Sequence, residues 1–161
     1  MSSLSPEEQL ERMRREWDER ARENARYYVN TEKRDWTDEE FFQSGKRTVA
    51  EQILNDMTNI CQGKEPKQMT VLEIGCGAGR VTRALSEVFG KVYAVDVSPE
   101  MVAQAKAALA DRPGAMVFNN TGRDLSVLPA GLKIDFAFST IVFQHIPSKD
   151  VIVNYVRDVH R

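Results

Sequence analysis

The stretch VLEIGCGAGRVT, residues 71–82, decides how the sequence is interpreted. An apolar run comes first, Gly75, Gly77 and Gly79 follow at alternate positions, and a helical pattern begins after them. Glycine adopts positive φ angles readily and lets another molecule approach the main chain closely. A strand, a glycine loop and a helix in this order are typical of a nucleotide-type ligand site at the carboxyl end of a parallel sheet. A tight turn is the alternative, but it needs only one or two glycines.

Length and composition indicate one ordinary globular domain. The chain has 161 residues, of which 42% are hydrophobic and 29% charged, and its formal net charge is -2. This charge gives no basic signature of a nucleic-acid binder and no reason to expect a membrane surface as partner. No apolar run approaches the roughly 20 residues that a membrane-spanning helix needs. Cys61 and Cys76 do not make a disulfide framework, so we expect a cytoplasmic protein with a small, buried, reduced thiol at Cys76.

The N-terminal part, residues 1–65, is highly charged and predicts a helical extension. Residues 5–8 and 37–40 each place a serine or threonine at the N-cap and a glutamate three positions later, which marks the start of a helix. Apolar residues then follow at helical spacings. The first stripe is Leu10, Met13, Trp17, Ala21, Ala25 and Tyr28, and the second is Phe42, Val49, Ile53, Met57 and Ile60, with residues 63–66 ending that helix.

The remainder, residues 66–161, alternates short β-rich runs with helical segments. The predicted strands are residues 70–74, 91–97, 115–120 and 133–140, and Ser98 and Ser148 have the sequence context of helix N-caps. Successive apolar residues mark strands that are covered on both faces, as in a parallel sheet. The alternation predicts right-handed βαβ units and therefore an α/β fold with a Rossmann-like sheet.

The glycine spacing also bears on the kind of ligand. A dinucleotide fingerprint, G-x-G-x-x-G, would place its third glycine at position 80, where this chain has Arg80. This departure weakens the case for an NAD-dependent oxidoreductase. Asp96 ends the second predicted strand about 20 residues after the loop, where a carboxylate can accept hydrogen bonds from ribose hydroxyls. Its structural alternative is a charge at the N-terminus of the helix that follows Ser98.

Two motifs together resemble a known family. EIGCGAG at residues 73–79 and VDVSPEM at residues 95–101 are similar to the motifs of class I S-adenosylmethionine-dependent methyltransferases of the small-molecule type. The resemblance covers residues 70–161 and continues through GRDL at 122–125 and IDFAFS at 134–139. It implies S-adenosylmethionine as cofactor, methyl transfer to a small-molecule acceptor by in-line displacement, and a sheet with strand order 3-2-1-4, part of the seven strands usual in the family.

The resemblance further implies a cofactor site. Gly75 and Gly77 would pass beneath the methionine part, Asp96 would bind the ribose diol, and residues 139–142 would lie beside the sulfonium. Val97 and Met101 would enclose the adenine. The full set of implied cofactor-binding residues is Glu73, Gly75, Cys76, Gly77, Asp96, Val97, Met101, Gly122, Arg123, Asp124, Ser139 and Thr140.

One position departs from the family pattern. An aspartate that accepts a hydrogen bond from the adenine amine often follows the third strand in this family. The corresponding position here is Thr121, with Asn120 and Asp124 nearby. The adenine contact is therefore left open by the motif.

Methyl transfer mainly requires alignment of the nucleophile and exclusion of water. A general base is needed only where the acceptor must lose a proton, and His145 is the candidate because its ordinary pKa suits that task. Its alternative role is to cap or pack under the helix that begins near Ser148. Trp17 and Tyr28 form either a lid over the site or ordinary helix packing. No metal-ligand spacing of cysteine and histidine occurs, so no metal is expected.

The chain ends with DVHR. In the resembled family a turn into a fifth strand usually follows, so we expect this sequence to be part of a longer methyltransferase that is truncated after the fourth strand and its helix. An apolar fourth strand at the edge of the sheet predicts self-association. A non-catalytic S-adenosylmethionine-binding module remains an alternative to the enzyme.

Overall fold

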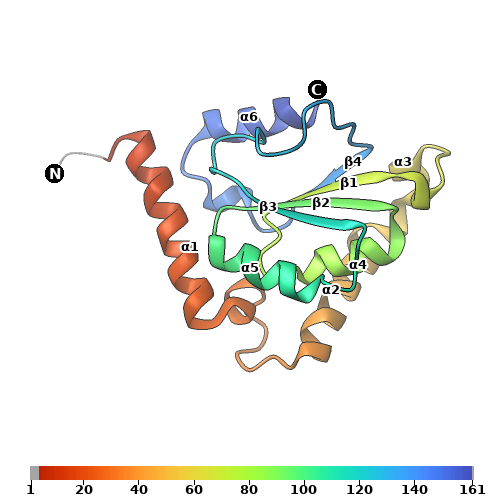
Figure 1. The fold of residues 1–161 in the computed structure, drawn as a ribbon, viewed down its shortest axis with the longest axis horizontal. Coiled ribbons are helices and arrows are strands. Elements are labelled where there is room, and N and C mark those ends of the chain that lie inside the picture. The colour runs from red at the N-terminus through yellow and green to blue at the C-terminus, as the bar shows by residue number, and fades with distance from the viewer. Residues whose placement is uncertain (1–3, 161) are drawn as a thin grey trace.

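A four-stranded parallel sheet lies at the centre of the computed structural model, which describes residues 4–160 (Figure 1). Its strands are β1 (Thr70–Ile74), β2 (Lys91–Asp96), β3 (Ala115–Asn119) and β4 (Phe136–Phe138), in the order β3-β2-β1-β4. In the register, Val71 of β1 pairs with Val92 of β2 and with Phe136 of β4. The predicted α/β class and the order 3-2-1-4 are therefore confirmed.

β4 (Phe136–Phe138) is shorter than the predicted strand of residues 133–140. At its start, the side chain of Asp135 takes part in the hydrogen bonding with β1. The Asp135 amide donates to the carbonyl of Thr70 over 2.9 Å, and its Oδ2 accepts from the amide of Thr70 over 2.8 Å. The other carboxylate oxygen, Oδ1, lies 2.7 Å from Nζ of Lys64. The side chain of Asp135 thus accepts the hydrogen bond that a backbone carbonyl of β4 would otherwise accept.

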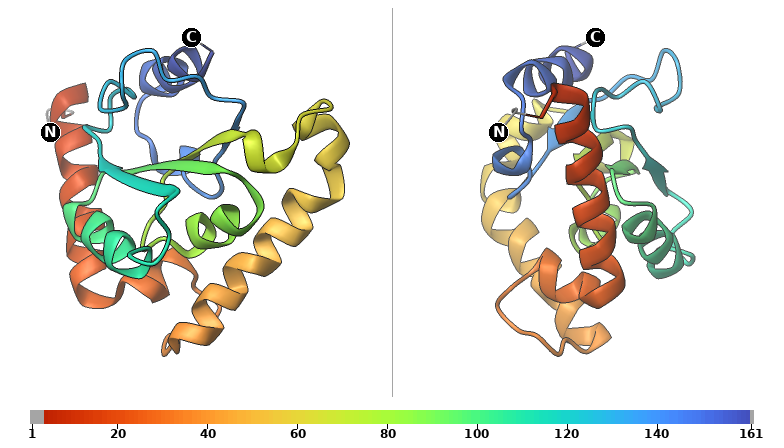
Figure 2. Two further views of the ribbon diagram at one scale, coloured as in Figure 1. Left: turned by 45° about the vertical axis from the view of Figure 1, so that its right-hand side comes forward. Right: turned by 90° about the vertical axis from the view of Figure 1, so that its left-hand side faces the viewer.

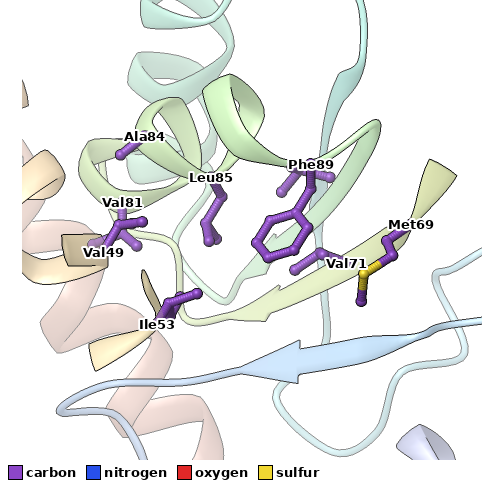
Figure 3. Close-up of a cluster of buried hydrophobic side chains, with 9 residues drawn as sticks. Val49, Ile53, Met69, Val71, Val81, Ala84, Leu85 and Phe89 are labelled. Atoms are coloured by element: carbon purple, nitrogen blue, oxygen red, sulfur yellow. The ribbon is translucent and has the colours of Figure 1, made fainter. Parts of the chain in front are cut away.

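Helices cover both faces of the sheet (Figure 1). One face carries α2 (Asp38–Gln52), α4 (Arg80–Val88) and α5 (Pro99–Ala108), and the other carries α6 (Lys149–Val159). Beneath α4, Phe89 and Leu85 pack against Val71 with at most 1% of each side chain exposed (Figure 3). Burial of one such side chain stabilises a fold by about 1.5–3 kcal/mol.

The first helix, α1 (Pro6–Val29), lies at one end of the sheet, where it packs against α5 and α2 (Figure 2). Ser5 and Glu8 form the predicted capping box at its start. The helix is kinked at Asn24, whose φ and ψ are -165° and 83° and whose Oδ1 accepts from the amide of Tyr27 over 3.2 Å. Asn24 therefore caps a second short segment that redirects Tyr28 and Val29 toward the sheet.

The second predicted helix is wrong in its extent. Thr37 and Glu40 form the expected capping box, but α2 ends at Gln52, and a 3-10 turn (η1, Leu54–Asp56) and the short α3 (Met57–Cys61) follow. The Asn55 amide donates to the carbonyl of Glu51, and such side-chain bonds compete with continued helix. The buried aromatic residue is Phe41, with Phe42 only partly covered.

The short connections are η2 (Pro66–Gln68) before β1 and η3 (Phe143–His145) after β4. Between residues 4 and 160, no helix combines the length and apolarity that crossing a bilayer requires.

Candidate functional site

The glycine loop joins β1 to α4 in the predicted place. Gly75, Gly77 and Gly79 all have positive φ angles, of 76°, 53° and 84°. The amides of Gly75 and Cys76 both donate to the carbonyl of Val95, over 2.8 and 3.0 Å, so β2 holds the start of the loop. Gly79 is the N-cap of α4. The left-handed conformations explain why glycine stands at each of these positions.

Two valine side chains lie against this loop. A Cβ on Gly75 would be 2.3 Å from Cγ2 of Val142, and a Cβ on Gly77 would be 2.5 Å from Cγ2 of Val29. Both distances are shorter than the non-bonded contacts that Cβ atoms make in real proteins, so only glycine fits beside these valines. The motif predicted that another molecule approaches these glycines, and that stays a prediction. In this structure the space beside them is filled by Val29 at the end of α1 and Val142 after β4.

A cavity opens beside the loop at the carboxyl ends of β1 and β2. It is lined by residues from the loop, the strand ends, α1, the segment after β4, and α6. These are Met13, Trp17, Tyr28, Val29, Ile74, Gly75, Gly77, Val95, Asp96, Val97, Met101, Asn120, Thr140, Ile141, Val142, His145, Ile146 and Tyr155. Trp17 and Tyr28 thus line the cavity from α1, and Trp17 also packs against the cluster that contains Ala21 and Ala25, so a lid and ordinary packing both stay open.

Asp96 stands at the end of β2 and is held by backbone amides. Its Oδ2 accepts from Gly77 over 2.8 Å and its Oδ1 accepts from Ser98 over 3.0 Å. Burial raises the pKa of the Asp96 carboxyl, and the amides of Ser98 and Gly77 oppose that rise. Each carboxylate oxygen has a second lone pair for a further donor. Asp96 therefore both fixes the glycine loop and offers acceptors to the cavity.

Asn120 and Tyr155 bring a second polar group to the cavity. Asn120 is 3% exposed, and its Nδ2 donates to the Tyr155 hydroxyl over 2.6 Å and to the Asp124 carbonyl over 3.4 Å. Because a carbonyl can only accept, these contacts fix which end of the amide is nitrogen. Oδ1 is buried and has no partner among the described residues. A buried acceptor of this kind costs stability unless a ligand or water donates to it.

The segment after β4 carries the third part of the lining. Ile141 has a φ of 56°, and its side chain is 67% exposed. A positive φ angle is unusual for a β-branched residue, and such strained backbone conformations cluster at functional sites. The ring of His145 meets the ring of Trp17 edge to face, with centroids 5.2 Å apart. The His145 amide donates to the Val142 carbonyl over 2.9 Å. His145 thus faces the cavity and packs on α1, and its side chain does not cap α6.

Six of the twelve proposed cofactor-binding residues lie outside the cavity lining, and Glu73 and Cys76 are the first two of them. Glu73 is 3% exposed and points toward α4, where its Oε2 accepts from the Thr82 hydroxyl over 2.6 Å. Burial raises the pKa of Glu73 to about 7. Cys76 is a buried free thiol in the cluster under α5, and burial raises its pKa as well.

The segment after β3 also turns most of its side chains away. Thr121 is exposed and its Oγ1 accepts from the Arg123 amide, while Arg123 itself pairs with Glu7 of α1. Asp124 accepts from Ser126, over 3.1 Å from the amide and 2.7 Å from the hydroxyl. Gly122 is buried beside Val97 and Met13. The residue of this segment that lines the cavity is Asn120, one position before the family's usual aspartate.

Ser139 likewise serves the fold, because its hydroxyl donates to the carbonyl of Ile74 over 3.0 Å. Thr140 beside it does line the cavity. The structure therefore brings together Gly75, Gly77, Asp96, Val97, Met101, Thr140 and His145 of the predicted site residues.

Several lining residues were missed by the sequence reasoning. Tyr155 lies one helical turn after Val151, on the buried face of α6, where a hydroxyl is a visible signal for a polar partner. Val29 carries no motif, because its position follows from the kink at Asn24. Val142 was expected only as part of the range 139–142 beside the sulfonium, and its contact with Gly75 was not predicted. Met13 was identified only as part of a stripe.

The hydrogen-bond acceptors of the cavity fit an adenosine-type ligand. A carboxylate, Asp96, can accept from two hydroxyls, and an unpartnered amide oxygen, Asn120 Oδ1, can accept from an amine. Val97 and Met101 add apolar surface beside them. In the part of the chain that the structure describes, no group of three or more His, Cys, Asp or Glu side chains could hold a metal ion.

Comparisons with known proteins agree with this geometry. Residues 71–161 match the sequence profile of the family described as methyltransferase domain. A malonyl-[acyl-carrier protein] O-methyltransferase of Anoxybacillus flavithermus is 46% identical over 46 residues, which cover 27% of this chain and 18% of that protein.

Solved methyltransferase structures share the fold. Phosphoethanolamine N-methyltransferase 1 of Haemonchus contortus, in complex with phosphoethanolamine and S-adenosylhomocysteine, superposes with a TM-score of 0.73 at 14% identity, covering 98% of this chain and 30% of that one. Magnesium protoporphyrin IX methyltransferase of Synechocystis, with bound SAM, gives 0.58 at 19% identity, covering 94% and 69%. The chain spans less than a third of the curated relative and of the Haemonchus enzyme. Because the family profile covers more than half of the sequence, this chain belongs to the methyltransferase domain family.

Proposed function

We propose that the chain binds S-adenosylmethionine in the cavity beside the glycine loop and serves methyl transfer to a small-molecule acceptor. The observation that carries the proposal is the pair of acceptors in one cavity. Asp96 is fixed by the amides of Gly77 and Ser98, and Asn120 Oδ1 is buried without a protein partner among residues 4–160. The solved neighbours with bound S-adenosylmethionine or S-adenosylhomocysteine support the same cofactor.

In the proposed complex, each lining residue has a defined task. Asp96 accepts from the ribose hydroxyls, and Asn120 Oδ1 accepts from the adenine amine in place of the family's usual aspartate. Val97 and Met101 contact the adenine faces. The cofactor supplies a methyl group that is already activated on a sulfonium, so the protein has only to orient it and exclude water.

Gly75 and Gly77 leave room for the methionine part only if Val142 and Val29 withdraw, because these side chains now lie against the loop. Both belong to segments at the cavity wall, the end of α1 and the turn after β4. We therefore propose that cofactor binding is accompanied by a displacement of these two segments.

The acceptor side is proposed to lie between Trp17, Tyr28 and His145, which line the cavity from α1 and η3. His145 is exposed at this wall and can receive a proton from an acceptor hydroxyl or amine. Where the acceptor loses no proton, the residue serves only as packing against Trp17. The two free thiols, Cys61 and Cys76, fit the reducing conditions of the cytoplasm, which is the proposed location.

A binding experiment tests the cofactor assignment. We expect S-adenosylhomocysteine to bind saturably in calorimetric titration, and NAD, titrated in parallel, to give no saturable heat. Asp96→Ala should weaken the affinity at least about thirtyfold, because hydrogen bonds to a charged group contribute about 1.5–3 kcal/mol each. NAD binding, or unchanged affinity in Asp96→Ala, would overturn the assignment.

The matched control is Asp111→Ala. Asp111 is an exposed carboxylate that pairs with Arg83 on the far side of α4 and α5, outside the cavity lining. Its removal should leave the S-adenosylhomocysteine affinity within about twofold, since exposed ion pairs contribute little. Transfer of labelled methyl groups from S-adenosylmethionine to an acceptor then separates the enzyme from a non-catalytic binding module.

A further inference from the structure

An arginine of α1 lies across the aromatic wall of the cavity. The guanidinium carbon of Arg20 is 4.8 Å from the centroid of the Trp17 ring and 5.8 Å from that of the Tyr28 ring. Both rings line the cavity. Arg20 itself is partly buried and is not among the lining residues, and it lies against the two rings that the acceptor is proposed to contact.

Arg20 forms no ion pair among the described residues, and on α1 it shares this with Arg14, whereas three other arginines close to it in the helix are paired. Arg12 pairs with Glu16 over 2.6 Å, Arg15 with Glu19 over 4.0 Å and Arg22 with Asp18 over 2.7 Å. Within residues 4–160, no carboxylate oxygen lies within 4.0 Å of the Arg20 nitrogens. The charge of Arg20 contributes to the lowered pKa of Glu16, but only from beyond ion-pair distance. A guanidinium that packs on two rings with no carboxylate in direct contact is available to an outside anion.

The two carboxylates one helical turn from Arg20 are engaged elsewhere. Glu16, one turn before Arg20, accepts from Nε of Arg12. Glu23, one turn after it, accepts from the Tyr28 hydroxyl over 2.9 Å and pairs with Arg34 over 3.5 Å. The bond from the Tyr28 hydroxyl also orients the Tyr28 ring. Glu16 and Glu23 are thus bound to other side chains, and neither forms an ion pair with the Arg20 guanidinium.

A guanidinium that stacks on aromatic rings keeps its N–H groups in its own plane, where they can bind an oxyanion with two parallel hydrogen bonds. Carboxylate and phosphate have the matching geometry. The rings offer apolar contact to the rest of the same molecule.

We propose that the methyl acceptor carries an oxyanion, a carboxylate or a phosphate, which Arg20 binds beside the cavity while Trp17 and Tyr28 contact the body of the molecule. The proposal rests on the proposed function, because it concerns the acceptor side of the same cavity. Arg20 is then a specificity-determining residue that selects anionic acceptors.

The test uses small probes that share one ring and differ in charge. Benzoate and phenyl phosphate carry the two oxyanions, and benzamide is the neutral match of benzoate. Binding is followed by the fluorescence of Trp17 in a Trp36→Phe background, since Trp36 lies outside the cavity lining. Each titration is run with and without S-adenosylhomocysteine, whose own affinity is measured in the same samples.

We expect at least one oxyanion to bind about tenfold or more tightly than benzamide, as a charge-assisted hydrogen-bonded pair would give. Which oxyanion binds more tightly distinguishes carboxylate from phosphate acceptors. Arg20→Met, which keeps the length and apolar contact, should reduce the preference to within about twofold, and Arg20→Lys should keep only part of it. Arg15→Met removes an exposed charge from the same helix and should preserve the preference in full.

Equal affinity for benzamide and both oxyanions, or an undiminished preference in Arg20→Met, would overturn the proposal and leave Arg20 as a brace between two rings. Binding of S-adenosylhomocysteine with no probe binding would do the same while the cofactor assignment stands. An Arg20-dependent preference without any S-adenosylhomocysteine affinity would support the oxyanion site and refute the proposed cofactor.

Discussion

Glu73 and Asp96 are two carboxylates on neighbouring strands with opposite surroundings. Glu73 lies one residue before the end of β1, is covered by α4 and accepts from the Thr82 hydroxyl. Asp96 is the last residue of β2, accepts from two backbone amides and lines the cavity. Burial raises the pKa of both groups. Position relative to the strand end, rather than residue type, therefore separates a carboxylate of the core from one of the ligand site.

The strongest test of this comparison is alanine substitution of each carboxylate, because we expect opposite effects on stability and on cofactor affinity. Glu73→Ala leaves the buried Thr82 hydroxyl unpaired and opens a cavity under α4, so the free energy of unfolding should fall by about 2–4 kcal/mol. Its affinity for S-adenosylhomocysteine should stay within about threefold, whereas Asp96→Ala should lose affinity with a smaller loss of stability. Urea denaturation and calorimetry measure the two quantities.

Glu73→Gln is the matched variant, because its amide oxygen still accepts from Thr82. It should retain most of the stability that Glu73→Ala loses. A loss of cofactor affinity in Glu73→Gln as large as that in Asp96→Ala would erase the distinction between the two carboxylates.

The pH dependence of stability is the next largest expected effect. In the unfolded chain the Glu73 carboxyl has its ordinary pKa of 4.5, whereas in the folded chain its pKa is about 7. The folded state therefore binds more protons in this window, and its stability falls as pH rises from 4.5 to about 7 and then levels off. The contribution of Glu73 to this fall is about 3 kcal/mol.

Urea denaturation at several pH values across the window measures the slope. The raised pKa of Asp96 acts in the same direction, so the difference between the wild type and Glu73→Gln isolates Glu73. Identical slopes in the two proteins would show that the folded Glu73 carboxyl titrates as it does in the unfolded chain.

A smaller effect is expected from the polar pair on the other side of the cavity. Tyr155→Phe removes the hydroxyl that accepts from Asn120 Nδ2 over 2.6 Å, which should cost about 1 kcal/mol of stability. With the amide less firmly held, the affinity for S-adenosylhomocysteine should fall about threefold, the equivalent of roughly half a hydrogen bond. Tyr93→Phe, on the same face of the sheet but outside the cavity, should leave the affinity unchanged.

The four strands could be predicted from the sequence because glycine spacing, apolar runs and helix caps are local signals that agree with one another, whereas the strand order came from the resemblance to a known family. The sequence located Asp96 from the same local signals, since the residue ends a strand next to the loop. It did not separate Glu73 from the site, because strands buried on both faces carry no alternation to show which side chain lies under a helix. The hydrogen bond between Asn120 and Tyr155 could not be predicted either, because it joins residues 35 positions apart and depends on how α6 packs against the sheet.

The break after Gln52 escaped prediction for a related reason. The apolar spacing of Ile53, Met57 and Ile60 continues as if the helix did, and these residues are packed by tertiary contacts from separate short turns. Periodicity reports which residues are buried, whereas the course of the backbone also depends on side-chain bonds such as that of Asn55 to Glu51.

The two edges of the sheet give the smallest and last expected effect. In the described chain β4 pairs with β1 alone, and its residues Phe136–Phe138 are only half-buried. At the opposite edge, β3 ends in Asn119, whose side chain donates to the Asp96 carbonyl over 2.9 Å and gives that edge a polar end. An apolar edge pairs with other chains more readily than a polar one, so we propose that the chain self-associates through β4.

Light scattering over a range of micromolar concentrations should give a mass above that of the 18.3 kDa monomer. A lysine after the edge strand opposes pairing, so Ile141→Lys, at a side chain that is 67% exposed, should lower the mass. Val153→Lys places the same charge on the exposed apolar face of α6, where Val153 is 51% exposed. If association passes through the strand edge, only Ile141→Lys dissociates the assembly. Dissociation by Val153→Lys alone would place the contact on α6. A monomer of the wild type at every concentration would show that the half-buried edge is already protected.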